Sequence, residues 1–153
     1  MDKILVQQLN LLNRLYKESS DIYTIAASQL KLTDTAFWIL YAVSHTNKDY
    51  TQMDFSNEWF YPIQTVNSAV SKLIKEDLVA LEVIHGTKNR KKIVLTEKGK
   101  QFISKTLYKI DEIEMTVFSM FTQEERETYL SLMRRHIDTL KKEMSNAFAS
   151  NND

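Results

Sequence analysis

The sequence contains no cysteine, which excludes several chemistries before any pattern is considered. A chain without thiols forms no disulfide bond, holds no metal through a thiolate and senses no peroxide through a cysteine. No stretch approaches the roughly 18 apolar residues of a membrane-spanning helix, and polar residues interrupt the first segment too often for a signal peptide. We therefore expect a cytoplasmic protein without a membrane partner.

Glycine and proline are also scarce, with two glycines and one proline among 153 residues. The tight turns and bulges of an all-β protein need more of both, so the fold is expected to be mainly α. A hydrophobic share of 43% and a charged share of 26% are typical of a folded chain and argue against disorder. The length favours a single domain, which we place over residues 1–153.

Residue constellations for catalysis or metal binding are missing as well. The three histidines, His45, His85 and His136, lie far apart and lack the close spacing of zinc ligands. Inspection finds no nucleophile with a paired base, no glycine-rich phosphate loop and no pair of catalytic carboxylates. We expect no catalytic residue, no metal site and no cofactor, and hence a protein that is not an enzyme.

Positive charge is concentrated in the middle of the chain, although twenty basic and twenty acidic residues balance overall. A net charge of zero by itself argues against a nucleic-acid partner. Between Pro62 and Lys105, however, there are nine basic and four acidic residues, which leaves eleven basic and sixteen acidic residues elsewhere. A local basic surface can attract phosphate groups even on a neutral molecule.

Apolar spacing predicts two helices in the first third of the sequence. Residues 3–28 repeat apolar side chains every three or four positions, which is the spacing of one helix face. Thr33 can cap a second helix, which ends near Thr46 and whose apolar residues extend beyond one stripe. We expect this second helix to lie at the centre of the fold.

Two shorter helices joined by a tight turn are predicted next. Thr51 can cap the first of them. Pro62 either stops that helix or starts the second, since proline suits a first helical turn but not a helix interior. Residues 63–75 gather apolar side chains on one side of the second helix and polar ones on the other. The apolar side comprises Val66, Ala69, Val70 and Leu73.

A β-hairpin with a charged tip is predicted after these helices. Aliphatic and β-branched runs at 78–84 and 93–95 flank the basic segment 86–92. Positive charge crowded into one turn repels itself unless an anion is the usual partner, although a solvated turn is the alternative interpretation. The candidate anion contacts are Lys88, Arg90 and Lys91.

Two long helices are predicted at the C-terminal end. Thr96 can cap a helix that continues to Phe121 with near-heptad apolar spacing. Thr122 and Glu125 then have the spacing of a capping box for a final helix that reaches Phe148.

Apolar side chains near both ends of the chain exceed what one small domain can cover. We therefore expect the first helix and the last two to form the interface of a homodimer. The residues concerned are Ile4, Leu5, Leu9, Tyr129, Met133, Ile137, Leu140 and Met144.

The order of these elements is that of a winged helix-turn-helix. A helix that enters the major groove of double-stranded DNA anchors one face in its own domain and presents short polar side chains on the other. Gln64, at the helix start, can form a bidentate contact with adenine, whereas serine, threonine and lysine suit phosphates. An ordinary solvent-facing surface is the alternative for this segment alone. The candidate contacts are Gln64, Thr65, Asn67, Ser68, Ser71, Lys72 and Lys75.

Several stretches, at 50–52, 58–68, 73–79 and 92–99, resemble the MarR family of transcriptional regulators. The most specific is Leu-Thr-Glu-Lys-Gly99 after the basic hairpin, since the helix-turn-helix pattern is shared by many families. The resemblance implies a mainly α fold with a small β-hairpin wing. It places the winged helix-turn-helix at 33–99, between dimerisation helices at 1–30 and 100–148. It also implies a homodimer on a pseudo-palindromic operator, usually repressing transcription and often released by a small molecule.

The chain departs from this family at two places. Asp77 stands where the family usually has glycine before the first strand, and aspartate can adopt a left-handed conformation at some cost. Thr87 and Asn89 stand where the wing usually has a paired aspartate and arginine, and Arg90 follows one place later. A shift of one residue in a hairpin turns a side chain to the other face unless the turn adjusts. Arg90 or Lys88 is therefore the candidate for the minor groove.

Aromatic side chains are concentrated around the second and third predicted helices. Core packing explains most of this concentration. The family often has a ligand pocket between its DNA-binding and dimerisation regions, which implies a possible site for a small aromatic ligand. The candidate ligand contacts are Phe37, Trp38 and Tyr41.

Two functions from different classes are compatible with the sequence. The first is a DNA-binding repressor, and the second is a winged-helix module that dimerises and binds another protein without binding an operator. The two hypotheses differ at the basic hairpin, because a protein-binding module does not need its cations. Binding to DNA, unlike binding through such a module, should weaken steeply as salt is raised.

Overall fold

A computed structural model of the protein describes residues 2–149, so Met1 and residues 150–153 of the expected domain lie outside it. The described residues form two compact units, one ending at Tyr108 and the other beginning at Lys109. The mainly helical class with a single antiparallel hairpin in this part of the chain is confirmed. That the whole chain acts as one domain stays a prediction.

The first unit contains five helices and the hairpin. Side chains placed just before four of the helices cap them, because Asp2, Thr33, Thr51 and Thr96 each accept a hydrogen bond from a backbone N–H of the first turn. Pro62 precedes a helix without such a side-chain cap, and the preceding helix ends at Trp59. The helices are α1 (Lys3–Gln29), α2 (Asp34–Ser44), α3 (Gln52–Trp59), α4 (Ile63–Lys75) and α5 (Glu97–Lys105).

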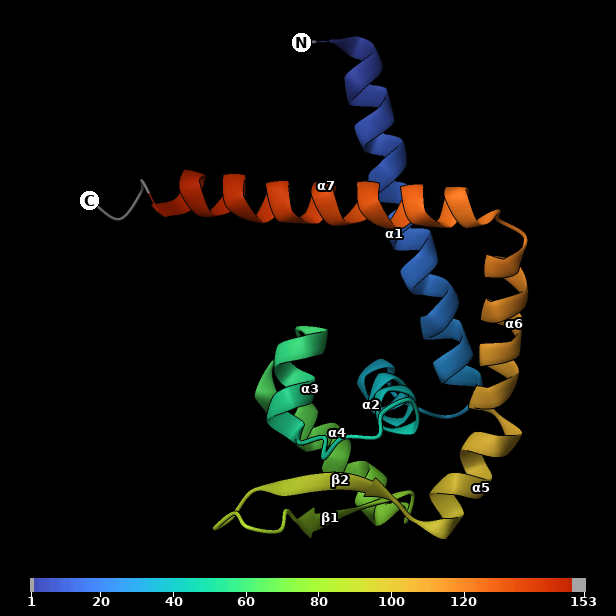
Figure 1. The fold of residues 1–153 in the computed structure, drawn as a ribbon, viewed down its shortest axis with the longest axis vertical. Helices are drawn as coiled ribbons and strands as arrows, with labels where there is room; N and C mark the ends of the chain where they lie inside the picture. The colour runs from blue at the N-terminus through green and yellow to red at the C-terminus, as the bar shows by residue number, and fades with distance from the viewer. Residues whose placement is uncertain (1, 150–153) are drawn as a thin grey trace. The chain divides into compact units, whose positions relative to one another are not determined.

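The core of the first unit is centred on α2, as its apolar pattern predicted. Phe37, Ile39 and Leu40 on this helix are completely buried. Helices α2, α3 and α4 gather on one side of the hairpin (Figure 1), and α2 and α4 pack directly against each other. Phe55 of α3 is also fully buried and is the buried residue of this short helix.

The hairpin consists of β1 (Val79–Val83) and β2 (Lys91–Leu95), paired antiparallel from Val79↔Leu95 to Val83↔Lys91. The loop before α3 lies along the other edge of β2. There the Ile93 amide donates to the Tyr50 carbonyl at 2.8 Å, and the Thr51 backbone forms an isolated antiparallel β-bridge with Lys92. The hairpin is thus joined to the start of α3 through backbone pairing.

A close backbone contact explains the Leu-Thr-Glu-Lys-Gly99 motif. A Cβ atom on Gly99 would lie 2.0 Å from the Leu78 carbonyl oxygen, so the start of α5 approaches the turn before β1 as only glycine allows. Thr96 accepts a bond from the Gly99 amide at 3.0 Å and donates one to the Asp77 carbonyl at 2.6 Å. Asp77 has φ 56°, so it adopts the left-handed conformation that aspartate can reach at some cost.

The prediction of a single helix from Thr96 to Phe121 is wrong, because the helix is interrupted at Thr106. Helix α5 ends at Lys105, and α6 (Leu107–Ser119) begins after a residue with φ −129° and ψ −71°. The Thr106 hydroxyl donates to the Phe102 carbonyl at 2.6 Å, and the Thr106 amide donates to the Ile103 carbonyl. Such side-chain bonding to the backbone competes with the regular helix ladder.

The second unit comprises most of α6 and the final helix α7 (Gln123–Ala149). The predicted capping box is confirmed, because the Glu125 amide donates to the Thr122 hydroxyl at 3.2 Å and the Thr122 amide donates to the Glu125 carboxylate at 2.7 Å. None of the residues of α7 is buried, and large apolar side chains such as Ile113 and Met115 of α6 are exposed. This unit therefore presents apolar surface that it does not itself cover.

Candidate nucleic-acid interface

Helix α4 has one buried face and one exposed polar face. Its buried residues are Val66, Ala69, Val70 and Leu73, as the apolar pattern predicted. Burial of these four residues sets the rotation of the helix and turns the opposite side chains toward solvent. All seven candidate contacts on this helix are exposed: Gln64, Thr65, Asn67, Ser68, Ser71, Lys72 and Lys75.

The exposed face of α4 offers hydrogen-bonding groups at its start and positive charge at its end. Gln64, Ser68, Ser71 and Lys75 follow one another at spacings of four, three and four residues, so they form a continuous stripe. The first turn has no side-chain cap, which leaves backbone N–H groups available beside Gln64. The base edges in the major groove of DNA offer hydrogen-bond acceptors for such polar groups, and the phosphates beside the groove offer negative charge for the lysine.

The turn before α4 is anchored to α2. The Tyr61 hydroxyl donates to the Asp34 carboxylate, and the Ser56 hydroxyl donates to the Tyr61 carbonyl at 2.7 Å. Burial, and then the bond to Asp34, raises the pKa of Tyr61, so its hydroxyl keeps its proton and remains a donor. Phe60 ends α3 in the left-handed region with φ 58°, which reverses the chain direction before Pro62.

The tip of the hairpin carries the remaining candidate contacts, Lys88, Arg90 and Lys91, and all three are exposed. The Ile84 amide donates to the Arg90 carbonyl at 2.9 Å, which extends the pairing by one step beyond the strands. Gly86 adopts φ 77°, a conformation that glycine reaches without strain. The tip thus presents its cations on a closed turn.

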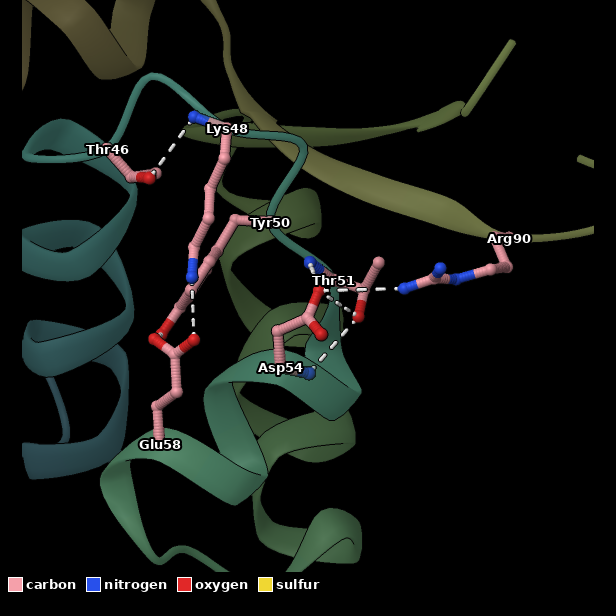
Figure 2. A network of polar contacts seen from close by, with 7 residues as sticks. All are labelled: Thr46, Lys48, Tyr50, Thr51, Asp54, Glu58 and Arg90. Atoms are coloured by element: carbon pink, nitrogen blue, oxygen red, sulfur yellow. Dashed lines mark hydrogen bonds and ion pairs between the residues drawn. The ribbon is translucent and has the colours of Figure 1, made fainter. Parts of the chain in front are cut away.

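Polar contacts connect the hairpin with the residues around the start of α3 (Figure 2). The Lys92 ammonium lies 2.8 Å from the Asp49 carboxylate, and this bond raises the pKa of Lys92. An Arg90 guanidinium nitrogen lies 3.9 Å from Oδ2 of Asp54. Sequence reasoning missed Asp54, although its position three residues after Thr51 is the spacing of a capping box and could have drawn attention to it.

A second set of contacts holds the loop between α2 and α3 in place. The Glu58 carboxylate accepts bonds from the Lys48 ammonium at 2.6 Å and from the Tyr50 hydroxyl at 2.9 Å. These bonds lower the pKa of Glu58, the one from Lys48 most. Figure 2 shows both donors converging on Glu58 from the loop above α3. The residues that pair with β2 are therefore held against α3.

No protein-family model and no curated protein matches the sequence. Solved structures do match. The chain is similar to a MarR family regulator from Neisseria meningitidis, with 21% identity, a TM-score of 0.72 and coverage of 95% of this chain and 99% of that one. It is also similar to MepR from Staphylococcus aureus in a complex with DNA, with 22% identity, a TM-score of 0.69 and coverage of 85% and 94%. The chain has the MarR fold.

A further solved structure of the MarR fold is MarR from Staphylococcus aureus in complex with salicylate and kanamycin. It shares 18% identity with this chain, with a TM-score of 0.68 and coverage of 92% of this chain and 95% of that one. At these identities the likeness concerns the fold. The predicted winged helix-turn-helix architecture is therefore confirmed, while the roles of individual side chains rest on their own geometry.

The aromatic residues of this MarR fold pack against one another. Phe37 is fully buried, and its ring lies 5.1 Å from that of Trp38, measured between centroids. Trp38 also contacts the rings of Tyr41 at 5.4 Å and Trp59 at 5.1 Å. Such ring-to-ring contacts are typical of aromatic side chains that pack against one another. A ligand-binding role for Phe37, Trp38 and Tyr41 stays a prediction.

Residues 2–149 contain neither a metal-binding cluster nor a membrane-spanning helix. Within that range, no group of three or more histidine, cysteine, aspartate or glutamate side chains is placed to hold a metal ion. No helix in the same range has both the length and the apolar character needed to cross a membrane.

Proposed function

We propose that the protein is a transcriptional regulator that binds double-stranded DNA through α4 and the hairpin. One observation carries this proposal. The polar stripe of α4 and the basic tip of the hairpin are exposed on the same compact unit, and every candidate contact belongs to one of them. MepR from Staphylococcus aureus, which has the same fold, was solved in a complex with DNA, and this supports the proposal.

In this proposal α4 enters the major groove and the hairpin contacts the adjacent backbone. Gln64 is assigned to a base edge, because its amide can donate to and accept from adenine. Thr65, Ser68 and Lys75 are assigned to phosphates, which fix the register of the helix without reading sequence. The exposed lysines of the tip add contacts that do not depend on sequence.

We further propose that the regulator acts as a homodimer and represses transcription from a pseudo-palindromic operator. Two-fold symmetry of the protein would place two copies of α4 on two half-sites about one helical turn apart. Exposed apolar residues on α1 and in the second unit are the surfaces that a second copy would cover. We also propose that a small aromatic ligand releases the regulator from its operator. The candidate ligand contacts are Phe37, Trp38 and Tyr41.

Salt-dependent DNA binding tests the proposal. Affinity is measured by fluorescence anisotropy for a duplex from the protein's own promoter and for a random duplex of equal length, at several salt concentrations. We expect the logarithm of the affinity to fall linearly with the logarithm of salt, with a slope of about −5, and the promoter duplex to bind more tightly. Absence of binding, or binding that salt does not weaken, would favour the protein-interaction module instead.

A further inference from the structure

The cations of the hairpin differ in whether an acidic partner is already present. Arg90 lies near Asp54, and Lys92 is bonded to Asp49. Over residues 2–149, neither Lys88 nor Lys91 forms an ion pair, and both are exposed. Two cations of this hairpin therefore have an acidic partner within the protein, and the two exposed lysines have none among the described residues.

Asp54 is an anion held firmly in place. Its Oδ2 atom accepts one hydrogen bond from the Thr51 amide at 2.9 Å and another from the Thr51 hydroxyl at 2.8 Å. The backbone bond from Thr51 is the main cause that lowers the pKa of Asp54, so the carboxylate stays charged at neutral pH. Its place in the first turn of α3 also suits a negative charge.

Arg90 reaches this anion from the hairpin. Figure 2 shows the Arg90 side chain extending from the residue before β2 toward the first turn of α3, where a dashed line joins it to Asp54. The two charges remain neighbours because the backbone holds their elements together, through the Ile93 bond to Tyr50 and the bridge between Thr51 and Lys92. Arg90 directly precedes β2, so these backbone contacts at Lys92 and Ile93 keep it close to the start of α3.

We propose that Asp54 is the resident counter-anion of Arg90, so that Lys88 and Lys91 supply the hairpin's contacts with DNA phosphates. A cation that contacts a phosphate strengthens binding by releasing condensed counterions. Arg90 must break its ion pair with Asp54 before it can contact a phosphate. Since Asp54 is already fixed by Thr51, pairing with it requires less ordering than pairing with a phosphate does. This proposal rests on the proposed function, and it identifies which side chains of the hairpin meet the DNA.

The first test compares three alanine variants on one random-sequence duplex. The salt slope is the slope of the logarithm of affinity against the logarithm of salt concentration. Lys88→Ala and Lys91→Ala should each make this slope shallower by about one for every hairpin bound to DNA. Arg90→Ala should leave the slope within about a third of a unit of the wild-type value. The lysine variants are matched controls for Arg90→Ala, because each of the three removes one exposed positive charge.

The second test releases Arg90. Asp54→Asn removes the negative charge and keeps an oxygen that can accept the Thr51 bonds, and Asp54→Gln is a second uncharged residue that suits a capping box. Either variant should steepen the salt dependence by about one unit per bound hairpin and raise affinity up to about fivefold at 0.15 M salt. Asp54→Asn combined with Arg90→Ala should return the slope to the wild-type value. Thermal melts identify which of the two Asp54 variants is folded.

The outcomes separate this proposal from the proposed function. If the wild type binds DNA with a steep salt dependence and Arg90→Ala flattens that dependence as much as Lys88→Ala does, Asp54 is not the resident partner. An unchanged slope in a folded Asp54 variant overturns it equally. A wild-type protein that shows no salt-dependent DNA binding removes the proposed function and this inference together.

Discussion

Gly99 has almost no room for a side chain beside its backbone. Replacement by alanine would place a Cβ atom 2.0 Å from the Leu78 carbonyl oxygen, so α5 and the turn before β1 would have to move apart. We expect Gly99→Ala to lower the free energy of unfolding by about 1–3 kcal/mol, the usual cost of forcing extra atoms into a packed site. A urea titration followed by circular dichroism measures the change.

Gly86 provides the matched control for this prediction. An added Cβ atom there meets nothing within 4 Å, although φ 77° remains unfavourable for alanine. Gly86→Ala should therefore cost only about 1 kcal/mol, which is the conformational penalty of the left-handed region. Equal losses in the two variants would contradict the steric explanation given for Gly99.

Helix α4 gives the prediction that concerns sequence recognition. Gln64 is exposed at the helix start, while the buried side of the helix is fixed by Val66, Ala69 and Val70. Gln64→Ala should weaken binding to the preferred operator by about 1–3 kcal/mol and leave binding to random DNA nearly unchanged. Affinities for both duplexes at one salt concentration measure this difference.

Ser68→Ala is the matched control, because its hydroxyl lies on the same stripe and is assigned to a phosphate. Its loss should be smaller than that of Gln64→Ala and similar on both duplexes. A thermal melt of each variant verifies the fold. If Gln64→Ala weakens both duplexes equally, Gln64 only positions the helix, and if it weakens neither, this face does not read DNA.

Most elements could be predicted because their signals are local. Thr33 and Thr51 cap the helices expected from them, and the period of apolar residues gave the buried side of α4 correctly. The break at Thr106 was missed, since apolar residues keep their helical spacing across it and a side-chain bond to the backbone leaves no periodic trace.

The contact between Asp54 and Arg90 could not be predicted for a different reason. The two residues are brought together by the pairing of the Tyr50 and Thr51 backbone with β2, and no local pattern records such long-range pairing. The sequence therefore left Arg90 as the candidate for the minor groove, with Lys88 as its rival. Only the neighbour of each cation in the folded chain distinguishes them.

At the scale of the whole molecule, we expect a homodimer. Ile4 and Leu5 of α1 are 65% and 60% exposed, and Met144 of α7 is 51% exposed. Apolar surface of this extent is rarely left uncovered by a soluble chain. Light scattering at micromolar concentration should give a mass of twice 17.9 kDa.

A variant that carries charge on this surface checks the same prediction. Leu5→Glu should shift the mass toward that of a monomer, whereas Lys88→Ala at the hairpin tip should not change it. A wild-type monomer at micromolar concentration would contradict the homodimer.

The pairing of β2 with the start of α3 also affects how freely the hairpin moves. A hairpin of two short strands is marginally stable alone, but here the Ile93 amide and Lys92 are held by the loop before α3. Most of the hairpin's conformational entropy has therefore been lost on folding. Association with a partner need restrict only the turn at residues 85–89, and more of the contact free energy remains available as affinity.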